Sequence, residues 1–353
     1  MLVERISRFV AAPAGEGFEE LALAAFAFQH ERIPAYRRLC EARGASPATV
    51  RDWREVPAVP ALAFKSLELH ADPPLETFRS SGTTQGGGAP SVHLHPYPDL
   101  YRETIECSFP RFCLPTLRTP APALSLVPDR EQAPDSSLAF MVAHVLDSWG
   151  AADSCTAFSA RGVDVPRARS WLAARQREAR PVLLLATSFA LAALLEALER
   201  RFLHFRLAPG SVVFETGGYK GRHQELSRDD LLSRIETWLG VPPGQVVREY
   251  GMTELTSQCY TAVLGGGDPD LFLSPHWMRA RVLHPETLAE QPPGEPGLLA
   301  LFDLANVGSA VHLLTEDLAA AEGEGFRLLG RAGEAELRGC SLTVEELAGG
   351  SHP

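Results

Sequence analysis

The stretch from residue 182 to residue 249 constrains the fold most, because short apolar strands alternate there with helical segments. Residues 182–200 begin as an apolar strand, pass through Thr187 and Ser188, and continue as a helix rich in leucine and alanine. Hydroxyl side chains at such a junction cap the first turn of a helix. The pattern repeats as a strand at 212–214, a helix at 227–239 and a strand at 246–249. This alternation predicts an α/β fold with a mostly parallel sheet, in which ligands bind beyond the carboxyl ends of the strands.

The segments on either side of this region have different patterns of apolar residues. Residues 17–43 carry an apolar band that predicts one helix, which Gly44 ends. A short apolar run at 123–127 lies between prolines and predicts a buried strand. Apolar runs separated by prolines and glycines over residues 271–315 predict a β-rich part. Residues 316–353 are too few for a further domain of ordinary size.

A loop rich in glycine and hydroxyl groups spans residues 79–88, with the sequence Arg-Ser-Ser-Gly-Thr-Thr-Gln-Gly-Gly-Gly. Glycines let backbone N–H groups approach an anion closely, and serine and threonine hydroxyls donate further hydrogen bonds to phosphate oxygens. No Gly-Lys-Ser or Gly-Lys-Thr follows, so the loop differs from the P-loop of many nucleotide-binding proteins. Taken alone, the pattern fits a phosphate-binding loop and a flexible surface linker equally well.

Two later segments add polar groups suited to the rest of a nucleotide. Residues 248–254, Arg-Glu-Tyr-Gly-Met-Thr-Glu, follow the last strand of the alternating region and offer an aromatic ring for a base, a hydroxyl for a phosphate and a carboxylate for Mg²⁺. Farther on, Asp317 could accept hydrogen bonds from ribose hydroxyls, and Arg331 could reach the same sugar or a phosphate. Each fragment alone also fits a structural role, so their order along the chain is the informative observation.

Composition argues against several classes of protein. The formal charge is −11 and there is no basic run, which does not favour a nucleic-acid partner. No apolar stretch is long enough to cross a membrane, and the first residues lack the features of a secretory signal. The six cysteines have no metal-ligand spacing and are expected to be reduced thiols of a cytoplasmic protein. Of the 33 basic side chains, only Lys65 and Lys220 are lysine.

The motifs Ser-Ser-Gly-Thr-Thr at 80–84, Tyr-Gly-Met-Thr-Glu at 250–254, Thr-Glu-Asp-Leu at 315–318 and Gly-Arg at 330–331 occur in this order. The set resembles the adenylate-forming (ANL) superfamily of acyl-CoA synthetases, adenylation domains and luciferases. Other segments are similar to one branch, the acyl-protein synthetases (LuxE type) of bacterial fatty-acid reductase complexes: Phe28-Gln29 with Tyr36 and Cys40, Phe64-Lys65, residues 215–221 and residues 338–342. The similarity therefore spans nearly the whole chain.

The resemblance implies an ANL-type α/β domain over residues 1–315, with a helical segment at 1–60, the β-rich part at 271–315 and a short tail at 316–353. It implies that ATP and Mg²⁺ activate a carboxylic acid, by analogy a fatty acid, as an acyl-adenylate. It also implies roles for individual residues: phosphate binding by Ser80, Ser81, Gly82, Thr83, Thr84 and Gly86; the adenine and acyl carboxylate region at Glu215, Gly217 and Gly218; adenine contact by Tyr250 and close backbone approach at Gly251; the α-phosphate near Thr253; Mg²⁺ on Glu254; and the ribose on Asp317 and Arg331.

The sequence departs from the superfamily pattern in three ways. Ala89 and Pro90 follow the glycine-rich loop in place of the lysine that often ends it. Glu316 stands where many members have glycine. The sequence ends 22 residues after Arg331, so we expect the full C-terminal lid domain and its late lysine to be truncated. Lys220, in the block at 215–221, is our candidate to neutralise charge during adenylation; a structural or surface role is the alternative.

The resemblance also implies that a cysteine near the C-terminus takes the acyl group as a thioester before it passes to an acyl reductase subunit. Cys340 lies 13 residues from the end, and Arg338 could favour its thiolate form. Residue type alone would instead predict a small buried side chain, the role we expect for the other five cysteines.

We therefore expect an AMP-forming acid–thiol ligase in the cytoplasm, with no nucleic-acid partner and no membrane span; self-association stays open. One alternative is an acyl- or aryl-CoA ligase of the phenylacetate-CoA ligase type, in which CoA replaces the protein thiol. Another is a non-catalytic member that serves as a binding subunit. The acid itself cannot be identified from sequence, because fold resemblance does not fix a substrate.

Overall fold

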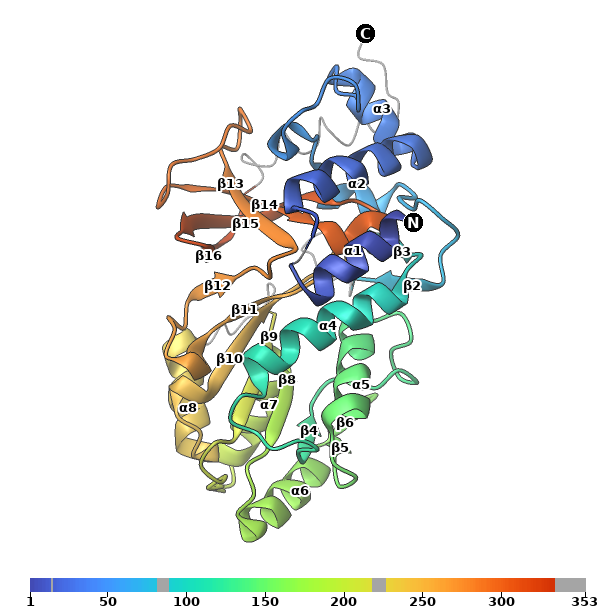
Figure 1. Ribbon diagram of the computed structural model, residues 1–353. Helices are drawn as coiled ribbons and strands as arrows, with labels where there is room; N and C mark the ends of the chain where they lie inside the picture. The colour runs from blue at the N-terminus through green and yellow to red at the C-terminus, as the bar shows by residue number, and fades with distance from the viewer. Residues whose placement is uncertain (14, 81–88, 218–226, 334–353) are drawn as a thin grey trace.

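The computed structural model describes residues 1–13, 15–80, 89–217 and 227–333. A twelve-stranded mixed sheet runs through these residues (Figure 1). Its strands are β1 (Val59–Pro60), β4 (Ala123–Ser125), β5 (Cys155–Thr156), β8 (Leu183–Thr187), β9 (Val212–Thr216), β10 (Val246–Tyr250), β11 (Cys259–Thr261), β12 (Leu271–Leu273), β13 (Met278–Leu283), β14 (Pro296–Asp303), β15 (His312–Glu322) and β16 (Gly325–Arg331). Two hairpins lie outside it, β2 (Glu76–Arg79) with β3 (Val92–His95) and β6 (Phe158–Ser159) with β7 (Gly162–Val163).

The eight α-helices of the described residues are α1 (Leu2–Ala11), α2 (Phe18–Arg32), α3 (Pro34–Ala42), α4 (Pro98–Cys113), α5 (Ser137–Trp149), α6 (Val165–Glu178), α7 (Ser188–Glu199) and α8 (Arg228–Leu239). The structure also has short 3₁₀ turns: η1 (Trp53–Glu55), η2 (Ala61–Lys65), η3 (Pro243–Gln245), η4 (Val263–Gly265) and η5 (Leu304–Gly308). Within the described part of the chain, every helix is too short or too polar to span a bilayer.

The sheet changes character at β10. On one side, β5, β4, β8, β9 and β10 are parallel neighbours. On the other side, β11, β12, β16, β15, β14 and β13 follow in antiparallel pairs. The predicted α/β class is confirmed, and so is the β-rich part after residue 271. The two regions form one continuous sheet, with the parallel half low and the antiparallel half high in Figure 1.

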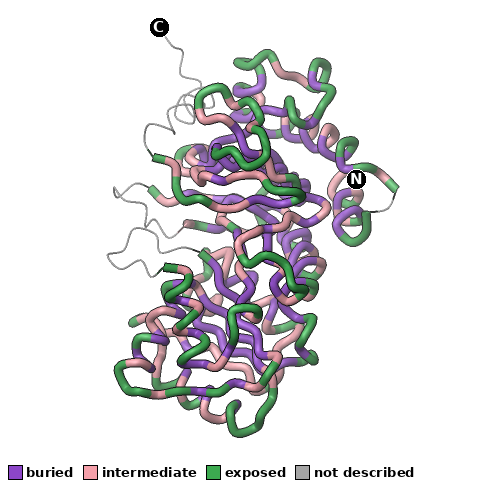
Figure 2. The backbone as a smooth tube through the Cα atoms, turned by 90° about the vertical axis from the view of Figure 1, so that its left-hand side faces the viewer, coloured by how far each residue is buried: buried purple, intermediate pink, exposed green. Residues whose placement is uncertain are grey.

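Helices cover both faces of the parallel half. Leu184 and Ala186 of β8 pack against α6, α7 and α8, whereas Leu183 and Leu185 pack against α4 and α5. Successive side chains of a strand point to opposite faces, so a strand buried on both faces is a continuous apolar run, as this sequence has. Figure 2 shows the result as a buried interior with exposed residues on the outer loops.

The N-terminal helices α1, α2 and α3 share a core with the antiparallel half. The prediction of one helix over 17–43 is wrong, because the chain breaks between α2 and α3 at Ile33, whose backbone is extended (φ −108°, ψ 99°). Pro34 follows, and a proline disfavours the helical conformation of the preceding residue and cannot donate a helical hydrogen bond. It is instead the first residue of α3, where its missing N–H has no consequence.

Strand β15 runs across the expected boundary between residues 315 and 316, and β16 pairs with it as far as Arg331. Residues 316–331 are thus part of the main sheet. The separate tail remains a prediction for residues 334–353, which lie outside the described residues.

Candidate active site

The motif at residues 250–254 begins where β10 ends, and the chain then reverses into β11. Tyr250 is buried, whereas Gly251 is exposed. The side chain of Glu249 lies against Gly251 so closely that a Cβ at this position would overlap its Oε1 atom. A methyl group at Gly251 would therefore force the buried Glu249 carboxyl to shift, while the neighbours of Gly251 place polar groups at the carboxyl end of a strand.

Tyr250 and Asp317 are in direct contact. The Tyr250 hydroxyl donates a hydrogen bond of 2.8 Å to Oδ2 of Asp317, a residue of β15. Arg331 stands opposite Asp317 in the β15–β16 register, and its Nε lies 3.2 Å from Asp317 Oδ1. Burial and the Asp317 carboxylate raise the pKa of Tyr250, so the phenol stays a donor at neutral pH. The two later motifs of the sequence are thus one cluster.

The β2–β3 hairpin, which forms the stem of the glycine-rich loop, contacts the loop that contains Thr253. At the end of the β2–β3 hairpin, Ser80 N donates to the Ser91 carbonyl (3.0 Å), and Ser91 N donates to Ser80 Oγ (2.9 Å). From β3, His93 Nδ1 lies 2.8 Å from the carbonyl oxygen of Thr253. The other predicted loop residues, Ser81, Gly82, Thr83, Thr84 and Gly86, lie outside the described residues.

The carboxyl end of β9 adds a further set of polar groups. Ser188, the first residue of α7, donates to the Glu215 carboxylate and is also in hydrogen-bonding contact with the Gly217 carbonyl. Arg248 Nε lies 3.7 Å from Glu215 Oε2. Glu215 is buried, and Gly217 has a positive φ of 75°, which favours glycine. Predicted residues Gly218 and Lys220 follow at once but lie outside the described residues.

Glu249 is the most perturbed acid of the site. It faces Thr216 across the parallel β9–β10 pair, and the Thr216 hydroxyl donates to its Oε2. Burial, with a contribution from the Glu215 carboxylate, raises the pKa of Glu249 to about 7, against a lowering effect of the Thr216 hydrogen bond. The site therefore holds a carboxyl group that stays protonated in mildly acidic solution and titrates near neutral pH.

Of the predicted site residues that the structure describes, direct contacts join Tyr250, Asp317 and Arg331, and Gly251, Thr253 and Glu254 follow Tyr250 in the same loop. Ser80 is connected to Thr253 through Ser91 and His93 of the β2–β3 hairpin, and Glu215 and Gly217 lie at the end of the adjacent strand β9. Cys340 lies outside the described residues. Sequence reasoning considered Ser188 only as a helix-capping hydroxyl and assigned no role in the site to Thr216, Glu249 or Asn306. A signal for Asn306 was present, because it is the only asparagine in the sequence.

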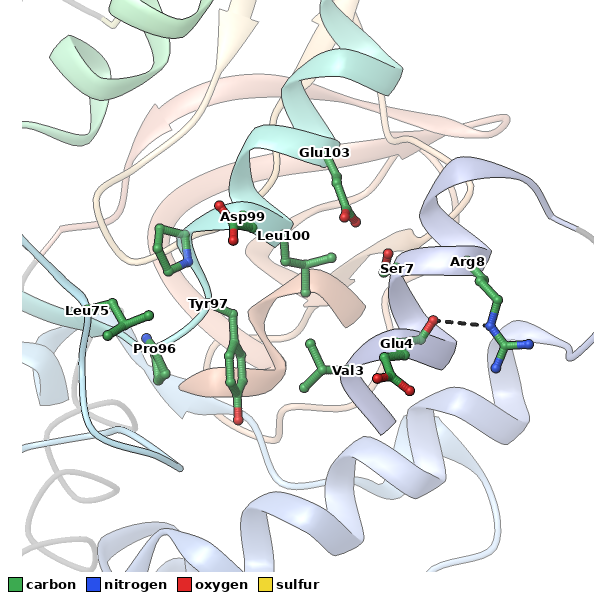
Figure 3. A pocket seen from close by; sticks show the side chains of 11 residues that line it. Val3, Glu4, Ser7, Arg8, Leu75, Pro96, Tyr97, Asp99, Leu100 and Glu103 are labelled. Atoms are coloured by element: carbon green, nitrogen blue, oxygen red, sulfur yellow. Dashed lines mark hydrogen bonds between the residues drawn. The ribbon is translucent and has the colours of Figure 1, made fainter. Parts of the chain in front are cut away.

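A cavity of about 630 Å³ lies elsewhere, between α1 and the start of α4. Figure 3 shows Val3 and Glu4 on one side and Tyr97, Asp99 and Glu103 on the other. None of the predicted site residues lines it. This cavity is therefore separate from the cluster around Tyr250.

The family model described as "Acyl-protein synthetase, LuxE" matches residues 16–348. The chain belongs to the LuxE acyl-protein synthetase family. A relative described as a long-chain-fatty-acid–luciferin-component ligase, from Vibrio harveyi, is 23% identical in an alignment 339 positions long, which covers 91% of this chain and 85% of that protein.

Solved structures of 2-hydroxyisobutyryl-CoA ligase share the fold. The open conformation, in complex with 2-HIB-AMP and CoA, aligns with a TM-score of 0.65 at 16% identity, covering 89% of this chain and 74% of that one. The postadenylation state, in complex with 2-HIB-AMP, aligns with a TM-score of 0.66 at 16% identity, covering 89% and 67%. The predicted ANL fold is confirmed, and family and fold together support an adenylate-forming enzyme that activates an acid.

Proposed function

We propose that this protein uses ATP and Mg²⁺ to activate a long-chain fatty acid as an acyl-adenylate. It then transfers the acyl group to the thiol of Cys340, and the resulting thioester supplies the acyl group to a reductase. The observation that carries the proposal is the 2.8 Å hydrogen bond from Tyr250 to Asp317, because it joins motifs that are 67 residues apart. The contact of His93 with Thr253 adds the stem of the glycine-rich loop. The printed name of the Vibrio harveyi relative supports a long-chain fatty acid.

The donor set fits a Mg-nucleotide. Asp317 retains a partly exposed carboxylate that can accept hydrogen bonds from ribose hydroxyls, and Arg331 is half exposed beside it. Among the described residues, no group of three or more His, Cys, Asp and Glu side chains could hold a metal. Mg²⁺ is commonly held by one or two carboxylates, water and substrate phosphates. We assign Glu254 as the protein carboxylate that would bind Mg²⁺.

The proposed reaction has two displacements. An oxygen of the acid attacks the α-phosphorus of ATP, and pyrophosphate leaves. The Cys340 thiolate then attacks the acyl carbon, the mixed anhydride bond breaks, and AMP leaves with its electron pair. The protein contributes orientation and fixed charges, and we assign Lys220 to the charge that develops on the phosphates.

Pyrophosphate exchange tests the first displacement, and acyl labelling tests the second. We expect exchange that depends on an added long-chain acid, and a labelled acyl group that stays on the wild-type protein. Cys340→Ala should keep exchange and lose the label. Cys107→Ala, at a partly exposed thiol on α4, is the matched control and should keep both. Equal labelling of all three proteins would remove Cys340 from the reaction.

A CoA ligase is the second candidate, since the 2-hydroxyisobutyryl-CoA ligase structure with the same fold is described with CoA. In that case CoA would stimulate AMP release, and Cys340→Ala would release AMP as fast as wild type. The two proposals share the first displacement and differ only in the thiol.

A further inference from the structure

The single asparagine of the sequence lies behind the candidate active site. Asn306 belongs to η5 and is 1% exposed. Its Nδ2 donates to the carbonyl oxygens of Glu254 (2.9 Å) and Ala310 (2.8 Å). Its Oδ1 accepts a hydrogen bond of 2.8 Å from Thr256 Oγ1. One side chain thus contacts the loop of Thr253 and Glu254 at two points, and also the turn that leads into β15.

Thr256 extends this connection to the hairpin of the glycine-rich loop. Its Oγ1 lies 3.0 Å from Nε2 of His95. The Thr256 hydroxyl has one proton, and it is directed to Asn306, so His95 must donate through Nε2. Burial lowers the pKa of His95 well below its usual value, which keeps the ring neutral, and the hydrogen bond to Thr256 selects the tautomer with its proton on Nε2. The order of donation is therefore His95 to Thr256, Thr256 to Asn306, and Asn306 to the Glu254 carbonyl.

A second connection runs beside the first. His93 lies two residues from His95 on β3, and its Nδ1 faces the carbonyl oxygen of Thr253, so this nitrogen must donate. Buried Asp303, which precedes η5, accepts from Thr256 N (3.2 Å) and from Ser257 Oγ (2.7 Å). Backbone groups on both sides of Glu254 are therefore bound by side chains of β3 and of the η5 region.

On the basis of the function proposed above, we infer that Asn306, acting with Thr256 and His95, is the positioning residue of the adenylation site. It holds Thr253 and Glu254 at a fixed place relative to the stem of the glycine-rich loop and to the strand that carries Asp317. Only a carboxamide supplies two N–H donors for the two carbonyls and an acceptor for the hydroxyl. An aspartate there would present an oxygen in place of the NH₂ group that binds both carbonyls.

Pyrophosphate exchange in variants of Thr256 separates positioning from general stability. We expect Thr256→Val to lower kcat by about tenfold, because a misplaced Glu254 weakens transition-state contacts. The Mg²⁺ concentration that gives a half-maximal rate should rise. The KM for ATP should change by less than about twofold. Thr256→Ser keeps the hydroxyl and should restore kcat to within about threefold of wild type. Asn306→Asp should resemble Thr256→Val or exceed its effect.

Ser211→Ala is the matched control. Ser211 is a buried hydroxyl that accepts from Val182 N and donates to the Ala208 carbonyl, at the amino end of β9, away from the site. It should lower Tm while leaving kcat and the Mg²⁺ dependence unchanged. All rates are compared well below the Tm of each variant, and the Thr256 pair decides the question even if Asn306→Asp does not fold.

Wild-type kcat and Mg²⁺ dependence in Thr256→Val would overturn the inference while leaving the proposed function intact. So would an equal loss of kcat in Ser211→Ala. Absence of acid-dependent exchange in the wild-type protein would overturn both the proposed function and the role of Asn306.

Discussion

Replacing Glu249 with glutamine should change how the stability of this protein depends on pH. The carboxyl of Glu249 is buried between β9 and β10, with its pKa raised from 4.5 to about 7. Glu215 contributes to this shift. The other titratable groups that interact with Glu249 have pKa values that burial raises above their usual range, and they stay neutral: Tyr101, Cys113, Cys259 and Tyr260. Glutamine keeps an oxygen that can accept the Thr216 hydrogen bond and removes the titration.

Proton binding to Glu249 determines whether the free energy of unfolding rises or falls with pH. Between pH 4.5 and about 7 the folded state holds a proton on Glu249 that the unfolded chain has released, so folding becomes less favourable as pH rises. The difference between the two pKa values corresponds to about 3 kcal/mol of unfolding free energy. This stabilisation is complete below the unfolded pKa and is lost as pH rises through the folded pKa. Asp303, whose pKa burial raises to about 6, titrates in both proteins and cancels in the comparison.

Urea denaturation at about pH 4 and about pH 8 measures the effect. We expect wild type to lose about 3 kcal/mol more than Glu249→Gln over this range. Glu236→Gln, on an exposed position of α8, provides the baseline for a neutralised glutamate and should follow wild type. A constant difference between wild type and Glu249→Gln across this pH range would refute the protonated state of Glu249.

Three further predictions concern the site. Tyr250→Phe removes the hydrogen bond to Asp317 and should raise the KM for ATP roughly fivefold. Its control is Tyr97→Phe, which loses a hydrogen bond to Asp72 beside the separate cavity and should leave the KM for ATP unchanged. Gly251→Ala places a methyl group against Glu249 and should lower the unfolding free energy by about 1–3 kcal/mol in urea denaturation, partly restored by Glu249→Ala; Gly244→Ala, in open space, should have little effect. Lys220→Ala should lower exchange by about tenfold or more while Lys65→Ala does not, and equal rates in both variants would remove Lys220 from the reaction.

The sequence predicted elements best where local signals agreed with tertiary packing. The strand and helix at 182–200 appear as β8 and α7, with the Thr187 hydroxyl accepting from Ala190 N at the junction. Ser227 caps α8 in the same way, by accepting from Asp230 N. Capping is a local interaction, so sequence alone identifies it. The break at Ile33 was missed because the apolar band continues across it, although Pro34 was visible.

The site residues also differ in how far local sequence signals identify them. Tyr250 and Asp317 were identified as motif residues, but their contact depends on β16 lying between β15 and β12, a pairing that no local pattern specifies. Glu249 was passed over because its pKa depends on how deeply β9 and β10 are covered by α4. Asn306 binds the loop of Glu254 from more than 50 residues away, and its hydrogen bonds become visible only in three dimensions.

The reversal at Gly251 explains why so many polar side chains are buried at this site. In the parallel half, a strand is usually followed by a helix, whose backbone satisfies its own hydrogen bonds. After β10 the chain instead turns directly into antiparallel β11, and the backbone groups of the connecting loop have no ladder partner. Buried unpaired carbonyl and N–H groups are unfavourable, so His93, Asn306 and Asp303 bind them at Thr253, Glu254 and Thr256. A loop fixed in this way holds a hydroxyl and a carboxylate rigidly, and the same bonds that permit the change from parallel to antiparallel pairing orient the groups proposed to bind the α-phosphate and Mg²⁺.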